Sequence, residues 1–132
     1  MPPLDLREDC RKEIDRHKWI VSYHAGRDVG NDAVNEWIRE HWLGYLRARC
    51  VEHVLGRRRW SELRECDYGL LQREFQDRAL LLDRIVDRWK VGQENLHIIN
   101  WALDWHIPID DVIDILTAID INGRRMAFQF YS

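Results

Sequence analysis

Proline is scarce in this chain of 132 residues and occurs only at positions 2, 3 and 108. Because proline removes a backbone hydrogen-bond donor and breaks helices, about a hundred consecutive residues lack the strongest helix breaker. Apolar residues recur along this stretch at intervals of three and four, the pattern of one helix face. The sequence therefore predicts an all-α protein.

The chain has only three cysteines, which are widely spaced and form no Cys-x-x-Cys pair. This odd number argues against a disulfide framework and indicates reduced thiols. No stretch reaches the ~20 apolar residues of a membrane span, and the first ten residues lack the basic and apolar segments of a secretory signal. We therefore expect a cytoplasmic protein that does not bind membranes.

The net charge of −3 provides no global basic field that would attract nucleic acid. The charge is nevertheless uneven, because residues 39–64 hold seven arginines and three glutamates, whereas residues 104–120 hold five aspartates and no lysine or arginine. Seven tryptophans are unusual for this length. Since each is large and carries an N–H that needs a partner, they indicate either a tryptophan-rich core or an exposed aromatic surface.

The apolar periodicity and the capping residues predict one domain, residues 1–132, built as a bundle of about five helices. We expect these helices at residues 4–25, 31–55, 67–90, 94–105 and 109–119. The last two have the apolar spacing of a helix-turn-helix pair, but the second of them is acidic and would be repelled by DNA phosphates. Residues 124–132 are expected to form a short extended tail.

The segment from residue 15 to residue 30, DRHKWIVSYHAGRDVG, is dense in polar side chains and ends at two glycines four positions apart. Helical phase places His17 and His24 on the inward face, where they are either hydrogen-bonded core residues or part of a site. A metal site would need a further ligand such as His41, because two helical turns separate the pair by roughly 10 Å. A binding pocket at this corner would use His17, Ser22, His24, Arg27 and Asp28, with Arg27 holding an anion.

Part of this segment resembles a motif that recurs in uncharacterised bacterial proteins. The matching residues are His17-Lys18-Trp19, Ser22 and the run Ala25-Gly26-Arg27-Asp28-Val29-Gly30. The motif has an acidic residue after the serine, where this chain has Tyr23. The resemblance implies that the segment acts as a unit and implies no activity.

Two further surfaces are candidates for contact with a partner. The aromatic tail contributes Phe128, Phe130 and Tyr131. The Arg-rich connector would contact phosphates or another protein, with its tryptophan stacking on a base. Its residues are Arg47, Arg49, Arg57, Arg58, Arg59, Trp60 and Arg64.

Two smaller patterns concern carboxylates. Glu94 and His97 have the spacing of a di-iron helix, but the chain has no second motif of this kind, so we expect no metal. Helical phase also places Glu52 and Arg78 inward, and with Glu74 they predict a partly buried ion-pair network.

These patterns favour a small non-catalytic protein-interaction or regulatory module, an accessory subunit of a larger assembly that binds another protein or itself. A first alternative is a nucleic-acid-binding protein that uses the arginines of residues 47–64. A second is an enzyme that uses a metal or a small molecule at the inward-facing histidines. The sequence contains no nucleophile elbow, nucleotide loop or Ser-His-Asp order, so we expect no cofactor and favour a non-enzyme.

Overall fold

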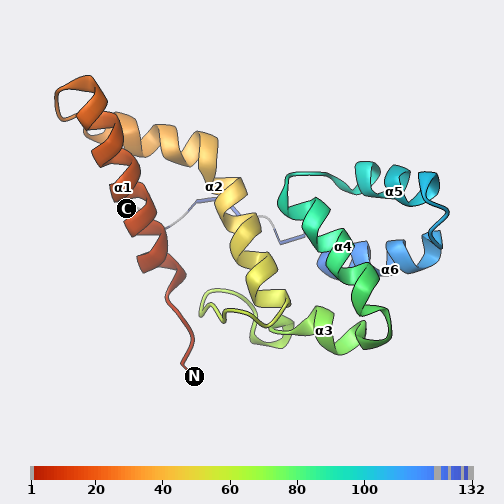
Figure 1. The fold of residues 1–132 in the computed structure, drawn as a ribbon. Coiled ribbons are helices and arrows are strands. Elements are labelled where there is room, and N and C mark those ends of the chain that lie inside the picture. The colour runs from red at the N-terminus through yellow and green to blue at the C-terminus, as the bar shows by residue number, and fades with distance from the viewer. Residues whose placement is uncertain (1, 121–122, 125, 129, 131–132) are drawn as a thin grey trace.

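The computed structural model describes residues 2–120, 123–124, 126–128 and 130 (Figure 1). It is all-α, as predicted, and its described residues contain no strand, only an isolated bridge between Leu4 and Trp60. The helices are α1 (Leu6–Ala25), α2 (Asn31–Val54), α3 (Leu70–Glu74), α4 (Ala79–Lys90), α5 (Asn95–Asp104) and α6 (Ile109–Ile119), with 3-10 turns η1 (Glu65–Asp67) and η2 (Gln76–Arg78). Within the described part of the chain, no helix has the length and apolarity needed to cross a membrane.

Helix α1 begins at Leu6 rather than at residue 4 because Leu4 is extended and exchanges backbone hydrogen bonds with Arg59 and Ser61. Its first turn is capped from two sides. The Asp5 carboxylate accepts from the Glu8 N–H, and the Glu62 carboxylate accepts from the Leu6 N–H at 2.9 Å. Such caps satisfy N–H groups that have no partner inside the helix.

The expectation of one helix over residues 67–90 is wrong, because α3, η2 and α4 divide this stretch. Gly69 has a left-handed conformation (φ 70°) before α3, and the backbones of Phe75 and Arg78 leave the helical region after it. The break lets the chain turn so that Leu71 and Phe75 are buried while Arg78 reaches α6. Tertiary packing therefore overrides the local helical preference here.

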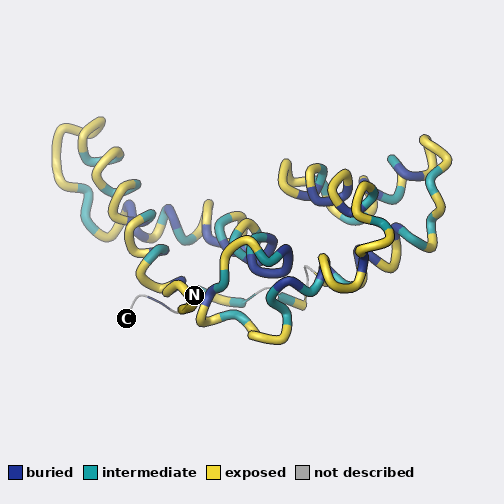
Figure 2. Tube along the Cα trace, turned by 60° about the horizontal axis from the view of Figure 1, so that its bottom comes forward, coloured by how far each residue is buried: buried dark blue, intermediate teal, exposed yellow. Residues whose placement is uncertain are grey.

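Two hydrophobic clusters share α2 (Figure 2). The end of α2 packs with α3, α4, α5 and α6, which we call the C-terminal lobe. The earlier part of α2 packs with the first half of α1, with Trp60 and with Phe130. Helices α1 and α2 form an antiparallel hairpin whose free end projects away from the C-terminal lobe (Figure 1).

The described part of the aromatic tail is folded into the molecule. The Trp42 indole N–H donates to the Met126 carbonyl at 2.8 Å, and the Phe130 side chain is only 6% exposed. The Phe128 ring lies against Trp42, with 5.2 Å between ring centroids. The prediction of a partner-binding tail is therefore wrong for the buried Phe130. Phe128 is partly buried, and Tyr131 lies outside the described residues.

The seven tryptophans divide between core and surface, so both predicted uses occur. Trp37, Trp42, Trp60 and Trp89 are buried, and Trp101 is partly buried. Only Trp19 and Trp105 are largely exposed.

Candidate functional site at the free end of the α1–α2 hairpin

The corner between α1 and α2 is held by its own polar groups. Gly26 ends α1 in a left-handed conformation (φ 69°), and its N–H donates to the carbonyls at the end of the helix. The Ser22 hydroxyl accepts from the Val29 N–H at 3.2 Å, and the Asp28 carboxylate accepts from the Gly30 N–H at 2.9 Å. These bonds account for Ser22 and Asp28 as turn residues.

The five residues of the predicted corner pocket do not converge. His24 and Arg27 are exposed, so the prediction that His24 faces inward is wrong. His17 is partly buried, with its Nε2 3.3 Å from Glu36 Oε1 and its ring centroid 5.5 Å from that of His41. The phase of the first half of α1 continues through His24, but none of residues 15–25 is buried among the described residues.

His41 is also exposed, although its ring lies against that of His17 between α1 and α2. Across the part of the chain that the structure describes, no group of three or more histidine, cysteine, aspartate or glutamate side chains is arranged to hold a metal ion. The Glu94–His97 pair has a structural role, because the Glu94 N–H donates to His97 Nδ1 at 3.2 Å in a capping box that begins α5.

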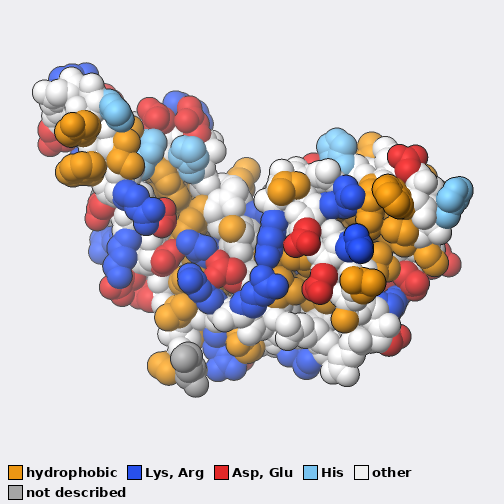
Figure 3. Space-filling model, in the orientation of Figure 1, with side chains coloured by type: hydrophobic (Ala, Val, Ile, Leu, Met, Phe, Trp, Pro, Cys, Tyr) orange, Lys and Arg blue, Asp and Glu red, His pale blue; other side chains and the backbone are white. Residues whose placement is uncertain are grey.

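Large hydrophobic side chains instead gather on the outside of the hairpin's free end (Figure 3). Trp19 is 68% exposed and Tyr23 is 72% exposed, and their rings stack with centroids 5.6 Å apart. Ile20 beside them is also exposed. We call Trp19, Ile20 and Tyr23 the exposed aromatic face.

The exposed aromatic face arises because the core ends midway along α1. The buried residues of α1 are Leu6, Cys10 and Ile14, and none of residues 15–25 is buried. Trp19 and Tyr23 are four positions apart on the side opposite to this buried stripe. Their spacing was visible in the sequence, but the exposure of the second half of α1 was not.

Next to this face, a groove of about 420 Å³ runs between α1 and α2. We call it the α1–α2 groove. It carries both apolar and charged side chains. Its lining residues are Glu13, Arg16, His17 and Ile20 of α1 with Trp37, Glu40, His41, Gly44 and Tyr45 of α2.

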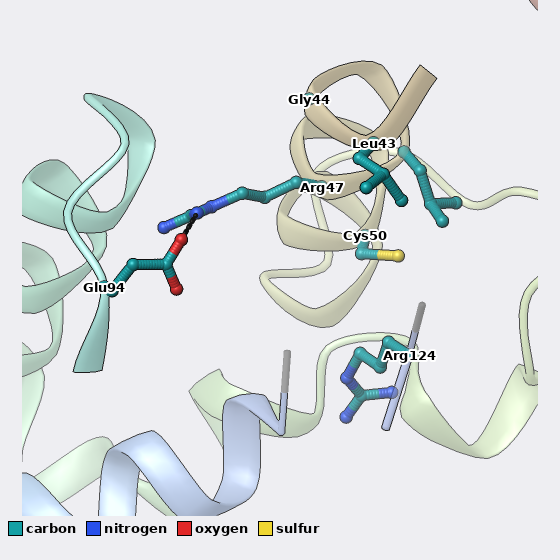
Figure 4. A pocket seen from close by; sticks show the side chains of 7 residues that line it. Leu43, Gly44, Arg47, Cys50, Glu94 and Arg124 are labelled. Carbon is teal, nitrogen blue, oxygen red and sulfur yellow. Dashed lines mark hydrogen bonds and ion pairs between the residues drawn. The ribbon is translucent and has the colours of Figure 1, made fainter. Parts of the chain in front are cut away.

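The Arg-rich connector is largely used inside the fold. The Arg47 guanidinium donates to the carbonyls of Trp89 at 2.9 Å and Gln93 at 2.6 Å, and to Glu94 at 3.1 Å (Figure 4). It also lies 4.4 Å from the centroid of the Trp89 ring. Arg47 therefore ties α2 to the connection between α4 and α5.

Arg49 makes a second internal link, from α2 to α1. It donates to Asp9 at 3.2 Å and to Glu52 at 2.6 Å, and it lies 4.8 Å from the Tyr45 ring centroid. Tyr45 donates to the same Asp9 carboxylate at 2.6 Å. Burial first, and then the hydrogen bond to Asp9, raises the pKa of Tyr45, so the phenol stays protonated.

The rest of the connector is divided between buried and exposed residues. Trp60 is 2% exposed, so the prediction that it stacks on a base is wrong. Arg58 is paired with Glu52, and Arg59 is paired with Glu65. The side chains of Arg57 and Arg64 are exposed and form none of the ion pairs found among the described residues.

The predicted network of Glu52, Glu74 and Arg78 is also wrong, since Glu52 pairs with Arg49 and Arg58. Arg78 instead binds the acidic helix α6, at 3.0 Å from Asp111 and 3.4 Å from Asp114. Arg78 thus neutralises part of the negative charge of α6 within the molecule.

A smaller cavity of about 260 Å³ lies between α2 and the C-terminal lobe, beside Arg47, Cys50 and Arg124 (Figure 4). Arg124 is already paired with Asp67 at 2.6 Å and donates to carbonyls at the end of α6. Burial raises the pKa of Cys50 to about 11, and burial likewise raises that of Cys10 to about 12. Since the thiolate is the nucleophile, these buried thiols are unsuited to catalysis near neutral pH.

Searches against protein-family models, curated proteins and solved structures found no match to this chain.

Proposed function

We propose that this protein is a small non-catalytic protein-interaction module, an accessory subunit of a larger assembly, and that it binds through the exposed aromatic face. The stacked and exposed pair of Trp19 and Tyr23 is the observation that carries the proposal. Tryptophan and tyrosine are enriched among the residues that dominate binding energy at protein interfaces. Exposed clusters of large apolar groups are also typical of interaction sites.

The other candidate surfaces support binding less well. The described aromatic tail is packed against Trp42, and the connector's tryptophan is buried. Arg47 and Arg49 are bound to groups of the protein itself. A nucleic-acid interface would retain Arg57, Arg58 and Arg64 as exposed arginines, of which Arg58 is already paired with Glu52. The tryptophan of the connector, Trp60, is buried and cannot stack on a base.

The test compares the proteins that copurify with three forms of the tagged chain from its native cells. One form is the wild type, one carries Trp19→Ser with Tyr23→Ser, and the matched control carries Trp105→Ser. Trp105 is 71% exposed but lies at the end of α5, far along the chain from the hairpin. We expect the wild type and the control to retain the same proteins and the double variant to lose them. Equal retention by all three forms would refute the assignment of this face.

A further inference from the structure

The aromatic tail, residues 124–132, contacts α2 in a pattern that alternates along the chain. The side chains of Met126 and Phe128 are partly buried and that of Phe130 is buried, whereas Ala127 is exposed. An extended segment presents every second side chain on the same side. The tail therefore lies on α2 in the way that an extended peptide ligand lies on its binding surface.

Trp42 of α2 contacts all three of these alternate positions. Its indole N–H donates to the Met126 carbonyl at 2.8 Å. The Phe128 and Phe130 rings meet it edge-on, with centroids 5.2 Å and 5.6 Å away and interplanar angles of 83° and 88°. Edge-to-face contact is a favoured geometry for aromatic pairs, so these two positions favour aromatic side chains.

The surface beneath the tail is held in place by groups outside the tail. The Tyr45 ring stacks on Trp42 with centroids 6.1 Å apart, and its hydroxyl donates to Asp9 of α1. Trp37, which the Phe128 ring also contacts at 6.4 Å, meets the Tyr45 ring edge-on at 5.5 Å. We call Trp37 and Trp42 the tail-binding surface. Because α1 and α2 fix its geometry, it is preformed, which lowers the cost of binding a ligand.

Arg124 anchors the start of the tail to the C-terminal lobe. It donates to Asp67 at 2.6 Å and to the carbonyls of Ile119 and Ala118 at 2.6 Å and 3.1 Å. None of these bonds involves α2, so the residues after Arg124 can leave α2 while α6 stays folded. The conformational entropy lost on ordering an extended segment opposes its ring contacts with an energy of similar size.

From this arrangement we propose that the aromatic tail is an exchangeable internal ligand. The tail-binding surface recognises an extended segment of a partner protein with aromatic side chains at alternate positions, and the seated tail keeps the surface closed until such a segment displaces it. Trp37 also lines the α1–α2 groove, so the surface is continuous with the groove beside the exposed aromatic face. This second surface goes beyond the proposed function and does not depend on it.

Competition by the tail sets the expected size of the effect. A ligand tethered by a short linker acts at an effective concentration on the order of millimolar. A free segment that binds the vacated surface with a dissociation constant of about 0.1 mM is therefore weakened about tenfold by the intact tail.

Fluorescence anisotropy of a labelled peptide with the sequence of residues 124–132, RRMAFQFYS, measures this competition. The wild type is compared with Phe128→Ala with Phe130→Ala, which weakens the protein's own tail, and with the matched control Leu96→Ala, an exposed leucine of α5. We expect the double variant to bind the peptide about tenfold more tightly than the wild type and the control do. A peptide with alanine at both phenylalanine positions is expected to bind none of the three proteins.

Circular dichroism shows whether each variant keeps its helices, and Phe128→Ala alone is a second variant because the Phe128 ring is only partly buried. The single variant is expected to bind the peptide several-fold more tightly than the wild type. If both variants lose their helices, the tail is a fixed part of the core and the inference is overturned. Equal peptide binding by folded variants and wild type, or equal binding of the alanine peptide, also overturns it. None of these results bears on the copurification experiment, which varies Trp19 and Tyr23.

Discussion

Replacing Arg47 by alanine should destabilise this protein substantially, although Arg47 lies in the arginine-rich residues 39–64, which the sequence suggests are a surface patch. Its guanidinium binds the Trp89 and Gln93 carbonyls and the Glu94 carboxylate. A hydrogen bond to a charged group contributes about 1.5–3 kcal/mol. The Glu94 side chain is half exposed, so we discount that bond as a screened ion pair.

The two carbonyl bonds then give about 3–6 kcal/mol. Part of this is offset because Arg47 Nε is buried without a hydrogen-bond partner among the described residues. Truncation also admits water to the freed carbonyls, which recovers some of the loss. We therefore expect Arg47→Ala to lower the free energy of unfolding by about 3 kcal/mol, toward the lower end of that range.

Urea denaturation followed by circular dichroism measures this change, and Arg57→Ala is the matched control. The Arg57 side chain is exposed, so its removal should change stability by no more than about 0.5 kcal/mol. Arg47→Lys should fall between them, because an ammonium keeps the charge but not the planar set of donors. If the free energy of unfolding of Arg47→Ala is within about 0.5 kcal/mol of that of the wild type, the guanidinium does not hold α2 to the connection between α4 and α5 and the reasoning fails.

Three other changes test the structure. Burial raises the pKa of Glu62, but hydrogen bonds from the Ser61 hydroxyl and the first amides of α1 outweigh it and leave the pKa below its ordinary value. Glu62→Gln should therefore lower the free energy of unfolding at pH 7 by about 1 kcal/mol, as measured by urea denaturation. This difference from the wild type should shrink as the pH falls below the ordinary pKa of 4.5, because the wild-type carboxylate is then protonated. Gly30→Ala should lower the melting temperature more than Gly26→Ala, because Gly30 combines φ 56° with ψ −136° whereas Gly26 is in the ordinary left-handed region. At pH 8 a thiol reagent should modify the exposed Cys66 at once and the two buried cysteines only on unfolding; equal rates for all three would contradict their burial.

Local signals predicted most of the helices. The glycines and cap residues placed the end of α1 and the limits of α2, and Pro108 separated α5 from α6 as expected. The prediction of one helix over residues 67–90 was wrong because the helical pattern there is continuous. The breaks in the structure allow Arg78 to reach α6, more than thirty positions away. Periodicity reports which residues share a face, and it carries no information about such distant partners.

The same limit explains the errors at the candidate site. Helical phase correctly placed Leu6, Cys10 and Ile14 in the core, but it extended the inward face to His24, which is exposed in the structure. A side chain that faces inward by phase is buried only if a second element reaches it. The Arg-rich connector shows the converse, since Arg47 binds carbonyls that are more than forty positions away.

Composition alone does not show which of the seven tryptophans are buried and which form a surface, and the fold decides this. Trp19 and Trp105 are almost equally exposed, so exposure alone does not distinguish a binding residue from an isolated surface ring. Trp19 stacks on Tyr23 beside Ile20 and a charged groove, whereas no ring contact involving Trp105 occurs among the described residues. Clustered apolar groups can exclude water from a contact together, which a single ring cannot do. That difference is why the free end of the hairpin is the proposed binding surface and why Trp105 serves as its control.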